Sequence, residues 1–201
     1  VKNHPALPYS EIGDFMKAIE GQEGVAAMGL QFLILTASRT GEVIGARWSE
    51  VDMDEKTWTI PAERMKARKP HRVPLSDKAI QILKTMNETR LSDYVFPGMR
   101  PKAPLSNMAF AALLKRMDHG HITAHGFRST FRDWAAECTA YPNEVCEQAL
   151  AHTVANRVEA AYRRGDLFDK RRRLMDDWTA YCYAPTVQAG SSVFPIRAEA
   201  R

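Results

Sequence analysis

Residues 25–39 read VAAMGLQFLILTASR, an apolar run that ends in a single charged side chain. A helix that is apolar on every side is normally buried in the core of a globular protein. The run is too short to cross a bilayer, which takes about 20 apolar residues. We therefore expect a central buried helix over residues 25–38, with Arg39 at its end.

Arg39 needs an anionic partner at this position, because burial removes the hydration of its guanidinium. Glu42 follows three residues later and could be that partner. The residues alone leave two interpretations open. The pair is either a structural ion pair at a helix boundary or a phosphate clamp, since the planar guanidinium matches phosphate oxygens in a bidentate way.

The chain around this helix is predicted to be mainly α with a small three-stranded antiparallel β-sheet. Three short β-prone runs separated by turn residues predict the strands, at residues 48–52, 57–60 and 71–75. Trp48, Trp58 and Phe96 are expected in the core.

The remaining periodicity is helical. An amphipathic stripe predicts a helix over residues 12–19 with Ser10 as its N-cap. Ser76 or Asp77 caps the helix after the sheet, which runs to residue 90. Further helices are expected over residues 105–117, 124–138, 143–151, 155–163 and 167–183.

The length of 201 residues fits one domain with a sizeable core. Residues 1–8, with two prolines, predict a linker into the domain, residues 9–183 its body, and residues 184–201 a loosely ordered tail. Three cysteines without metal-type spacing are typical of a reducing cytoplasm. No signal peptide opens the chain, so we expect a soluble cytoplasmic protein.

The net charge of +4 and the pI of about 9.0 weakly favour an anionic partner. The basic side chains are concentrated in two stretches of the chain. One stretch holds Arg64, Lys66, Arg68, Lys69 and Arg72, and the other holds Arg163, Arg164 and residues 170–173. Either stretch alone fits a solvated face as well as it fits a surface that binds anions.

The helix from Thr123 onward separates an apolar face from a basic one. At 100° per residue, the aromatic residues Phe127, Phe131 and Trp134 share one side of the helix. His125, Arg128 and Arg132 share the other side. Such a face is either solvated or part of an anion site. His119, His121 and His125 have no Asp, Glu or Cys nearby to complete a ligand set, so we expect no metal.

Five short motifs, in order, resemble those of the phage integrase (tyrosine recombinase) family. Residues 35–43 with 46–52 resemble its first arginine box, and residues 65–66 with 70–76 resemble its β-hairpin lysine region. Residues 125–128 (HGFR) resemble its His-x-x-Arg box, and residues 150–152 (LAH) its Leu-Gly-His box. Residues 160–162 (AAY) resemble the box of its nucleophile. The ending at residues 170–178 resembles integrases of phages and genomic islands.

The resemblance implies the catalytic domain of a site-specific DNA recombinase, which integrates or excises a mobile element such as a prophage. It implies that Tyr162 attacks a DNA phosphodiester and forms a 3′-phosphotyrosyl link, while Arg39 and Arg128 hold the phosphate. It further implies that His152 donates a hydrogen bond to the phosphate and that His125 assists proton transfer. Lys66 would be the general acid, with Lys69 as the alternative. Glu42 would orient Arg39. DNA contacts are expected from Arg64, Arg68, Lys69, Arg72 and Arg132.

The implied partners are double-stranded attachment-site DNA and three further copies of the chain in a synaptic homo-tetramer, with accessory DNA-bending or directionality proteins possible. No cofactor or metal is implied, because the tyrosyl link conserves the energy of the phosphodiester. The expected setting is the bacterial cytoplasm, in association with DNA. The alternatives are a type IB topoisomerase-like enzyme and a non-catalytic DNA-binding module.

Two features depart from the family pattern. Ala151 stands where the family usually has glycine, and we expect the change to be tolerated. The N-terminal DNA-binding region of such integrases is absent, so we expect the 201 residues to be a fragment.

Overall fold

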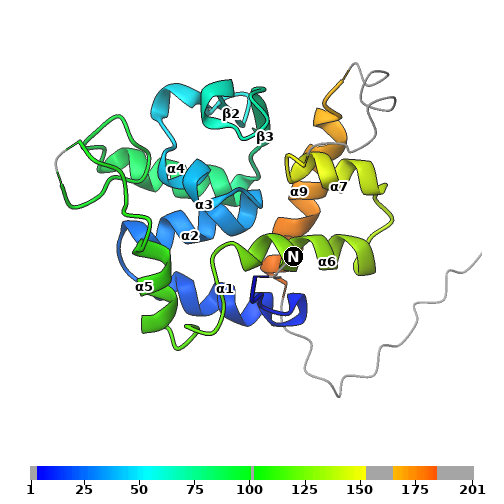
Figure 1. Ribbon diagram of the computed structural model, residues 1–201, viewed down its shortest axis with the longest axis horizontal. Helices are drawn as coiled ribbons and strands as arrows, with labels where there is room; N and C mark the ends of the chain where they lie inside the picture. Colours follow the sequence, from blue (N-terminus) through cyan, green and yellow to red (C-terminus); the bar gives the residue numbers. More distant parts are fainter. Residues whose placement is uncertain (1–3, 101, 153–164, 185–201) are drawn as a thin grey trace, which may run out of the picture.

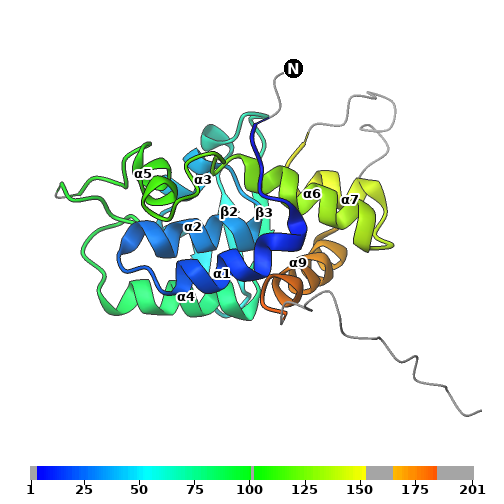
Figure 2. The same ribbon diagram turned by 90° about the horizontal axis from the view of Figure 1, so that it is seen from below.

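A computed structural model describes residues 4–100, 102–152 and 165–184 of the chain. It is mainly helical with one three-stranded antiparallel sheet (Figures 1 and 2), which confirms the predicted fold class. No helix in the described part is long and apolar enough to cross a membrane. The helices are α1 (Ile12–Glu20), α2 (Val25–Thr36), α3 (Thr40–Ile44), α4 (Asp77–Glu88), α5 (Ala109–Arg116), α6 (Gly126–Cys138), α7 (Asn143–Ala149) and α9 (Phe168–Cys182), with short 3₁₀ turns at Tyr9–Glu11, Trp48–Glu50 and Ala62–Arg64.

Helix α2 lies at the centre of the molecule, as the sequence predicts. From Ala27 onward all but one of its residues are buried, and α1, α3, α4, α5, α6 and α9 all contact it. The indole nitrogen of Trp178 in α9 donates a hydrogen bond of 2.8 Å to the carbonyl of Ile34. This bond joins the last helix of the described chain to the central one.

The sheet has the order β1-β2-β3, with strands Val51–Asp52, Thr57–Ile60 and His71–Pro74. The register places Trp58 opposite Val73, and both side chains are buried. The predicted first strand is too long, because Trp48–Glu50 forms a 3₁₀ turn whose amide at Arg47 donates to the Glu50 carboxylate. Trp58 and Phe96 are core residues as predicted, whereas Trp48 is only half-buried.

Some helices begin or end at other residues than the sequence predicts. Helix α2 stops at Thr36, two residues early, because Ala37 adopts the left-handed conformation with φ 48°. Arg39 is therefore the N-cap of the separate helix α3 and does not end α2. Ser10 lies within a 3₁₀ turn and is not the N-cap of α1, whereas Ser76 does cap α4 by accepting from the amide of Ala79.

The other predicted helices are found with shorter bounds. Helix α4 ends at Glu88, α5 begins at Ala109, α6 begins at Gly126, α7 ends at Ala149 and α9 spans Phe168–Cys182. The helix predicted over residues 155–163 and the tail beyond residue 184 lie outside the described residues.

The leading segment, residues 4–8, runs alongside α6. The carbonyl of Pro5 accepts hydrogen bonds from the amide and hydroxyl of Thr123, at 3.1 and 3.3 Å. The carbonyl of Leu7 accepts from the Thr130 hydroxyl at 2.6 Å. Gly126 permits this approach, because a Cβ there would lie 2.2 Å from the Pro5 oxygen.

We expect Gly126→Ala to destabilise the fold by about 1–3 kcal/mol, since the added methyl must displace backbone. Gly41→Ala is the matched control, because no atom lies within 4 Å of its Cβ position. That change should be neutral or stabilise by up to about 1 kcal/mol through helix propensity. Urea unfolding of the three proteins measures both effects, and equal stability of the two variants would contradict the packing argument.

Candidate active site

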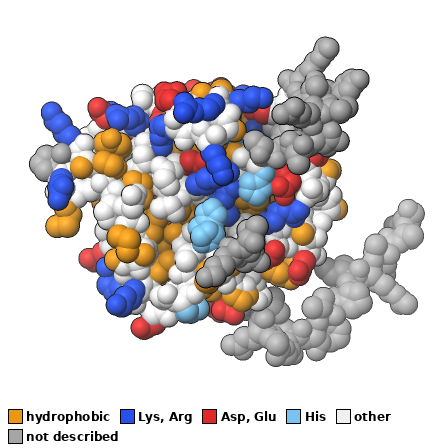
Figure 3. Space-filling view, in the orientation of Figure 1, with side chains coloured by type: hydrophobic (Ala, Val, Ile, Leu, Met, Phe, Trp, Pro, Cys, Tyr) orange, Lys and Arg blue, Asp and Glu red, His pale blue; other side chains and the backbone are white. Residues whose placement is uncertain are grey.

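One cavity of about 590 Å³ collects five of the six residues expected to be catalytic. It opens between α3, the β2–β3 hairpin, the start of α6 and the end of α7. The described residues that line it are Arg39, Lys66, Ala67, His125, Arg128, Glu147, Ala151 and His152. Figure 3 shows Lys, Arg and His side chains gathered near the middle of one face of the molecule. The sixth expected residue, Tyr162, lies outside the described residues.

Arg128 forms the floor of this cavity and is only 5% exposed. Its guanidinium donates 2.6 Å hydrogen bonds to the carbonyls of Ala37 and Leu150, and it lies 3.1 Å from Nε2 of His152. Burial, together with the charge of Arg39, lowers the pKa of Arg128 to about 10. The side chain therefore stays cationic at neutral pH although it is buried.

Arg39 and Glu42 form the predicted pair. Nη1 of Arg39 lies 2.8 Å from Oε1 of Glu42, and the second carboxylate oxygen accepts from the Arg39 amide at 2.8 Å. The other guanidinium nitrogen donates to the carbonyl of Ala151 at 3.3 Å. Glu42 is buried, whereas about a quarter of the Arg39 side chain is exposed. The carboxylate thus orients a guanidinium that still faces the cavity.

A short chain of polar contacts fixes His152. Its Nδ1 lies 2.7 Å from Oε2 of Glu147, and Oε1 of the same carboxylate accepts from Nε of Arg132 at 2.7 Å. Arg132 also contacts the side-chain oxygen of Asn143. The predicted basic face of α6 therefore packs against α7, and the guanidinium of Arg132 donates its hydrogen bonds to protein groups in this structure. Glu147 was not singled out from the sequence, because its link to His152 depends on how α7 ends.

His125 and Lys66 complete the lining from two other elements. His125 is the N-cap of α6. The residue is exposed, yet partial burial of its imidazole lowers the pKa, and the charges of His4, Arg128 and Arg39 lower it further. Lys66 is exposed on the hairpin and lines the cavity. Lys69 is also exposed but is not part of the lining, so the geometry favours Lys66 for chemistry inside the cavity.

The basic stretch of the hairpin divides into two groups. The guanidinium of Arg64 contacts the Glu50 carboxylate and the carbonyl of Glu42. Arg72 makes two hydrogen bonds of 2.9 Å to Asp166. Arg68 and Lys69 are exposed, and the described chain shows no ion pair for either. Among the predicted DNA contacts, these two have the freest side chains.

Asp166 also joins α9 to the sheet. Arg171, 1% exposed, donates to the carboxylate of Asp166 at 3.0 Å and to the carbonyl of Arg72 at 2.6 Å. The sequence predicts only a basic run here. The structure shows that one member of this run is buried and ties the start of α9 to strand β3.

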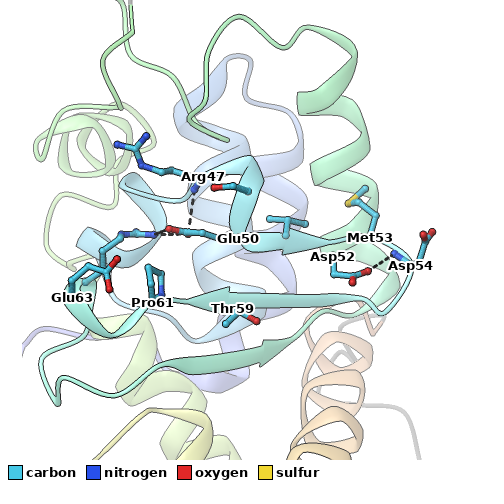
Figure 4. Close-up of a pocket in the computed structure, with 11 residues that line it drawn as sticks. Arg47, Glu50, Asp52, Met53, Asp54, Thr59, Pro61 and Glu63 are labelled. Carbon is cyan, nitrogen blue, oxygen red and sulfur yellow. Dashed lines mark hydrogen bonds and ion pairs between the residues drawn. The ribbon is translucent and has the colours of Figure 1, made fainter.

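A second and larger cavity, about 950 Å³, lies on the side of the sheet shown in Figure 4. Arg47 and Arg64 line it, but Glu50, Asp52, Asp54 and Glu63 do so as well. Carboxylates in this number repel a phosphate, so the larger cavity does not suit an anionic substrate. The described residues also contain no group of three His, Cys, Asp or Glu side chains that could hold a metal ion.

The model of the phage integrase family matches residues 6–167, and the chain belongs to that family. It is 38% identical over 175 residues to the prophage integrase IntZ of Escherichia coli (strain K12), and this alignment covers 86% of the present chain and 43% of the relative. It is 34% identical over 183 residues to the integrase of Shigella phage Sf6, covering 88% and 47%. The chain thus spans less than half the length of these relatives.

Solved structures show the same fold. The integrase of mycobacterium phage Brujita aligns with a TM-score of 0.65 at 16% identity, over 88% of this chain and 58% of the other. XerA recombinase aligns with a TM-score of 0.60 at 16% identity, over 88% and 64%. A lambda integrase tetramer bound to a Holliday junction aligns with a TM-score of 0.58 at 16% identity, over 83% and 50%.

The contacts of Glu147 predict a specific loss of stability in acid. Burial raises the pKa of this carboxyl group, but hydrogen bonds from His152 and Arg132 outweigh burial, and the net pKa is lowered. Its stabilising contribution is therefore present above the unfolded-state pKa of about 4.3 and is lost as the pH falls through the lower folded-state value.

We expect Glu147→Gln to be less stable than the wild type at neutral pH and to lose less stability between about pH 6 and pH 3. Urea unfolding at a series of pH values measures the difference. Glu63→Gln is the control, since Glu63 is exposed and has no ion pair in the described chain. Parallel curves for the wild type and Glu147→Gln would refute the role of the carboxylate.

Proposed function

We propose that this chain is the catalytic domain of a site-specific recombinase that cleaves and rejoins DNA through a 3′-phosphotyrosyl intermediate. The observation that carries the proposal is the convergence of Arg39, Arg128, His125, His152 and Lys66 on one cavity from four separate parts of the chain. Membership of the phage integrase family supports the same activity.

Two cations in the cavity suit the phosphate. The guanidiniums of Arg39 and Arg128 would bind its non-bridging oxygens and stabilise the charge that accumulates in the pentacoordinate transition state. Both are already oriented, one by Glu42 and the other by two carbonyls. With both ring nitrogens protonated, His152 would donate a further hydrogen bond from Nε2 to the phosphate in place of its contact with Arg128, while Glu147 accepts from Nδ1.

Proton transfer falls to the remaining groups. The lowered pKa of His125 favours a neutral imidazole at neutral pH, which can accept a proton from the phenol of Tyr162. Lys66 would protonate the departing 5′-oxygen, and it is the lysine of the hairpin that lines the cavity. Arg68 and Lys69 would hold DNA phosphates outside the cavity.

The partners follow from the same proposal. The substrate would be double-stranded attachment-site DNA, and the working form a homo-tetramer, which accords with the lambda integrase tetramer on a Holliday junction. The setting would be the bacterial cytoplasm. Accessory DNA-bending proteins are a further expectation. No observation favours the topoisomerase or the non-catalytic module.

We expect the protein to form a covalent adduct with a nicked duplex that carries its attachment site, because the short strand released after cleavage diffuses away and traps the tyrosyl link. Tyr162→Phe keeps the ring and removes only the nucleophilic oxygen, so adducts should vanish while non-covalent DNA binding stays within about twofold. A denaturing gel and a binding titration measure the two effects. A surviving adduct would exclude Tyr162 as nucleophile.

Replacement of the bridging 5′-oxygen by sulfur tests the role of Lys66. A thiolate leaves without a proton. Lys66→Ala should therefore cleave normal DNA about 10²–10⁴-fold more slowly than the wild type and recover most of that loss on the 5′-phosphorothiolate. Lys69→Ala is the matched control and should be mild on both substrates. The reverse pattern would move the general acid to Lys69. Failure of both variants to recover would assign the proton to another group.

A further inference from the structure

The leading segment follows α6 over nearly its whole length. Besides the bonds from Thr123 and Thr130, the hydroxyl of Tyr9 donates to the Glu137 carboxylate at 2.7 Å. From His4 to Tyr9 an extended chain spans about 17 Å, and from His125 to Glu137 a helix rises about 18 Å. The two lengths agree, so the segment lies extended beside α6 with its first described residue at the start of the helix.

His4 is that residue, and its side chain packs against His125, which lines the cavity. The rings of His4 and His125 lie 4.4 Å apart between centroids, tilted by 59°. Two bonds to the Pro5 carbonyl fix the backbone next to His4, and the glycine at position 126 lets that carbonyl approach. The two imidazoles therefore meet where Pro5 fixes the backbone after His4 and the start of α6 fixes the backbone at His125.

The surroundings of His125 are otherwise cationic. Arg128 of the same helix, Arg39 before α3 and His152 after α7 each disfavour its protonated form. Lys66 of the hairpin lines the same cavity, and Glu147 is the one carboxylate among the described residues of that lining. His4 adds to this environment in two ways, because its ring packs against one side of the exposed His125 and its charge disfavours the imidazolium.

We propose that His4 is a positioning residue for His125, which it holds in orientation and in the neutral state. The proposal rests on the proposed function for the meaning of that state, since a neutral His125 is the form that accepts a proton. The leading segment then does more than connect. It carries part of the active site, and a displacement of the segment would change the chemistry of His125 without altering Arg39, Arg128 or His152.

The test follows the imidazole signals of the whole 201-residue chain by NMR during a pH titration, in the wild type and in His4→Ala. The chain has six histidines, and single substitutions assign their signals. We expect the pKa of His125 to rise by about half a unit or more in His4→Ala, since the change uncovers the ring and removes a like charge. His121→Ala is the control and should leave the His125 titration unchanged.

An unchanged His125 titration in His4→Ala would overturn the proposal, and so would an equal shift in the control. If His4→Ala loses global stability, His4→Phe keeps a covering ring without a charge and should give a smaller rise in the same direction. The pH profile of adduct formation on the nicked duplex should move with the pKa of His125. A wild type that forms no adduct would remove the proposed function and leave the NMR result to decide the role of His4.

Discussion

The buried guanidinium of Arg128 bonds three parts of the chain that are far apart in the sequence. It binds the carbonyl of Ala37 after α2 and the carbonyl of Leu150 after α7, while its own backbone belongs to α6. A buried cation without these acceptors would cost several kcal/mol. The bonds that hold the fold together here are therefore the same bonds that aim a cation into the cavity.

The carboxylates near the cavity have a complementary task. Glu42 orients Arg39, and Glu147 orients His152 and receives Arg132. Glu42 is buried, and Glu147 lines the cavity beside the three cations Arg39, Lys66 and Arg128, so the field where a phosphate would lie stays net positive. The carboxylate-rich cavity beside the sheet is larger but lacks this arrangement, so charge and geometry favour the smaller cavity as the candidate site.

Sequence periodicity predicted the central helix, the sheet and the faces of α6, because each depends on the local alternation of apolar and polar residues. The resemblance of five ordered motifs to the phage integrase family, rather than periodicity, predicted that Arg39, Lys66, His125, Arg128 and His152 lie together. Periodicity could not predict the left-handed Ala37 that ends α2, since one dihedral leaves no trace in the apolar pattern. Nor could it pair Arg64 with Glu50 or Arg72 with Asp166, because residues far apart in sequence meet only after folding.

The carbonyl of Leu150 sets the spacing of the two arginines, because it accepts from Arg128 at 2.6 Å and from Arg39 at 3.4 Å. The turn that presents this oxygen has Ala151 at φ 50°, a left-handed conformation that glycine adopts without strain and alanine does not. Alanine at this position therefore costs backbone energy, of order 1 kcal/mol. Two like charges share one acceptor, and their repulsion contributes to the low pKa of Arg128 after burial. A phosphate bound between the guanidiniums would relieve that repulsion.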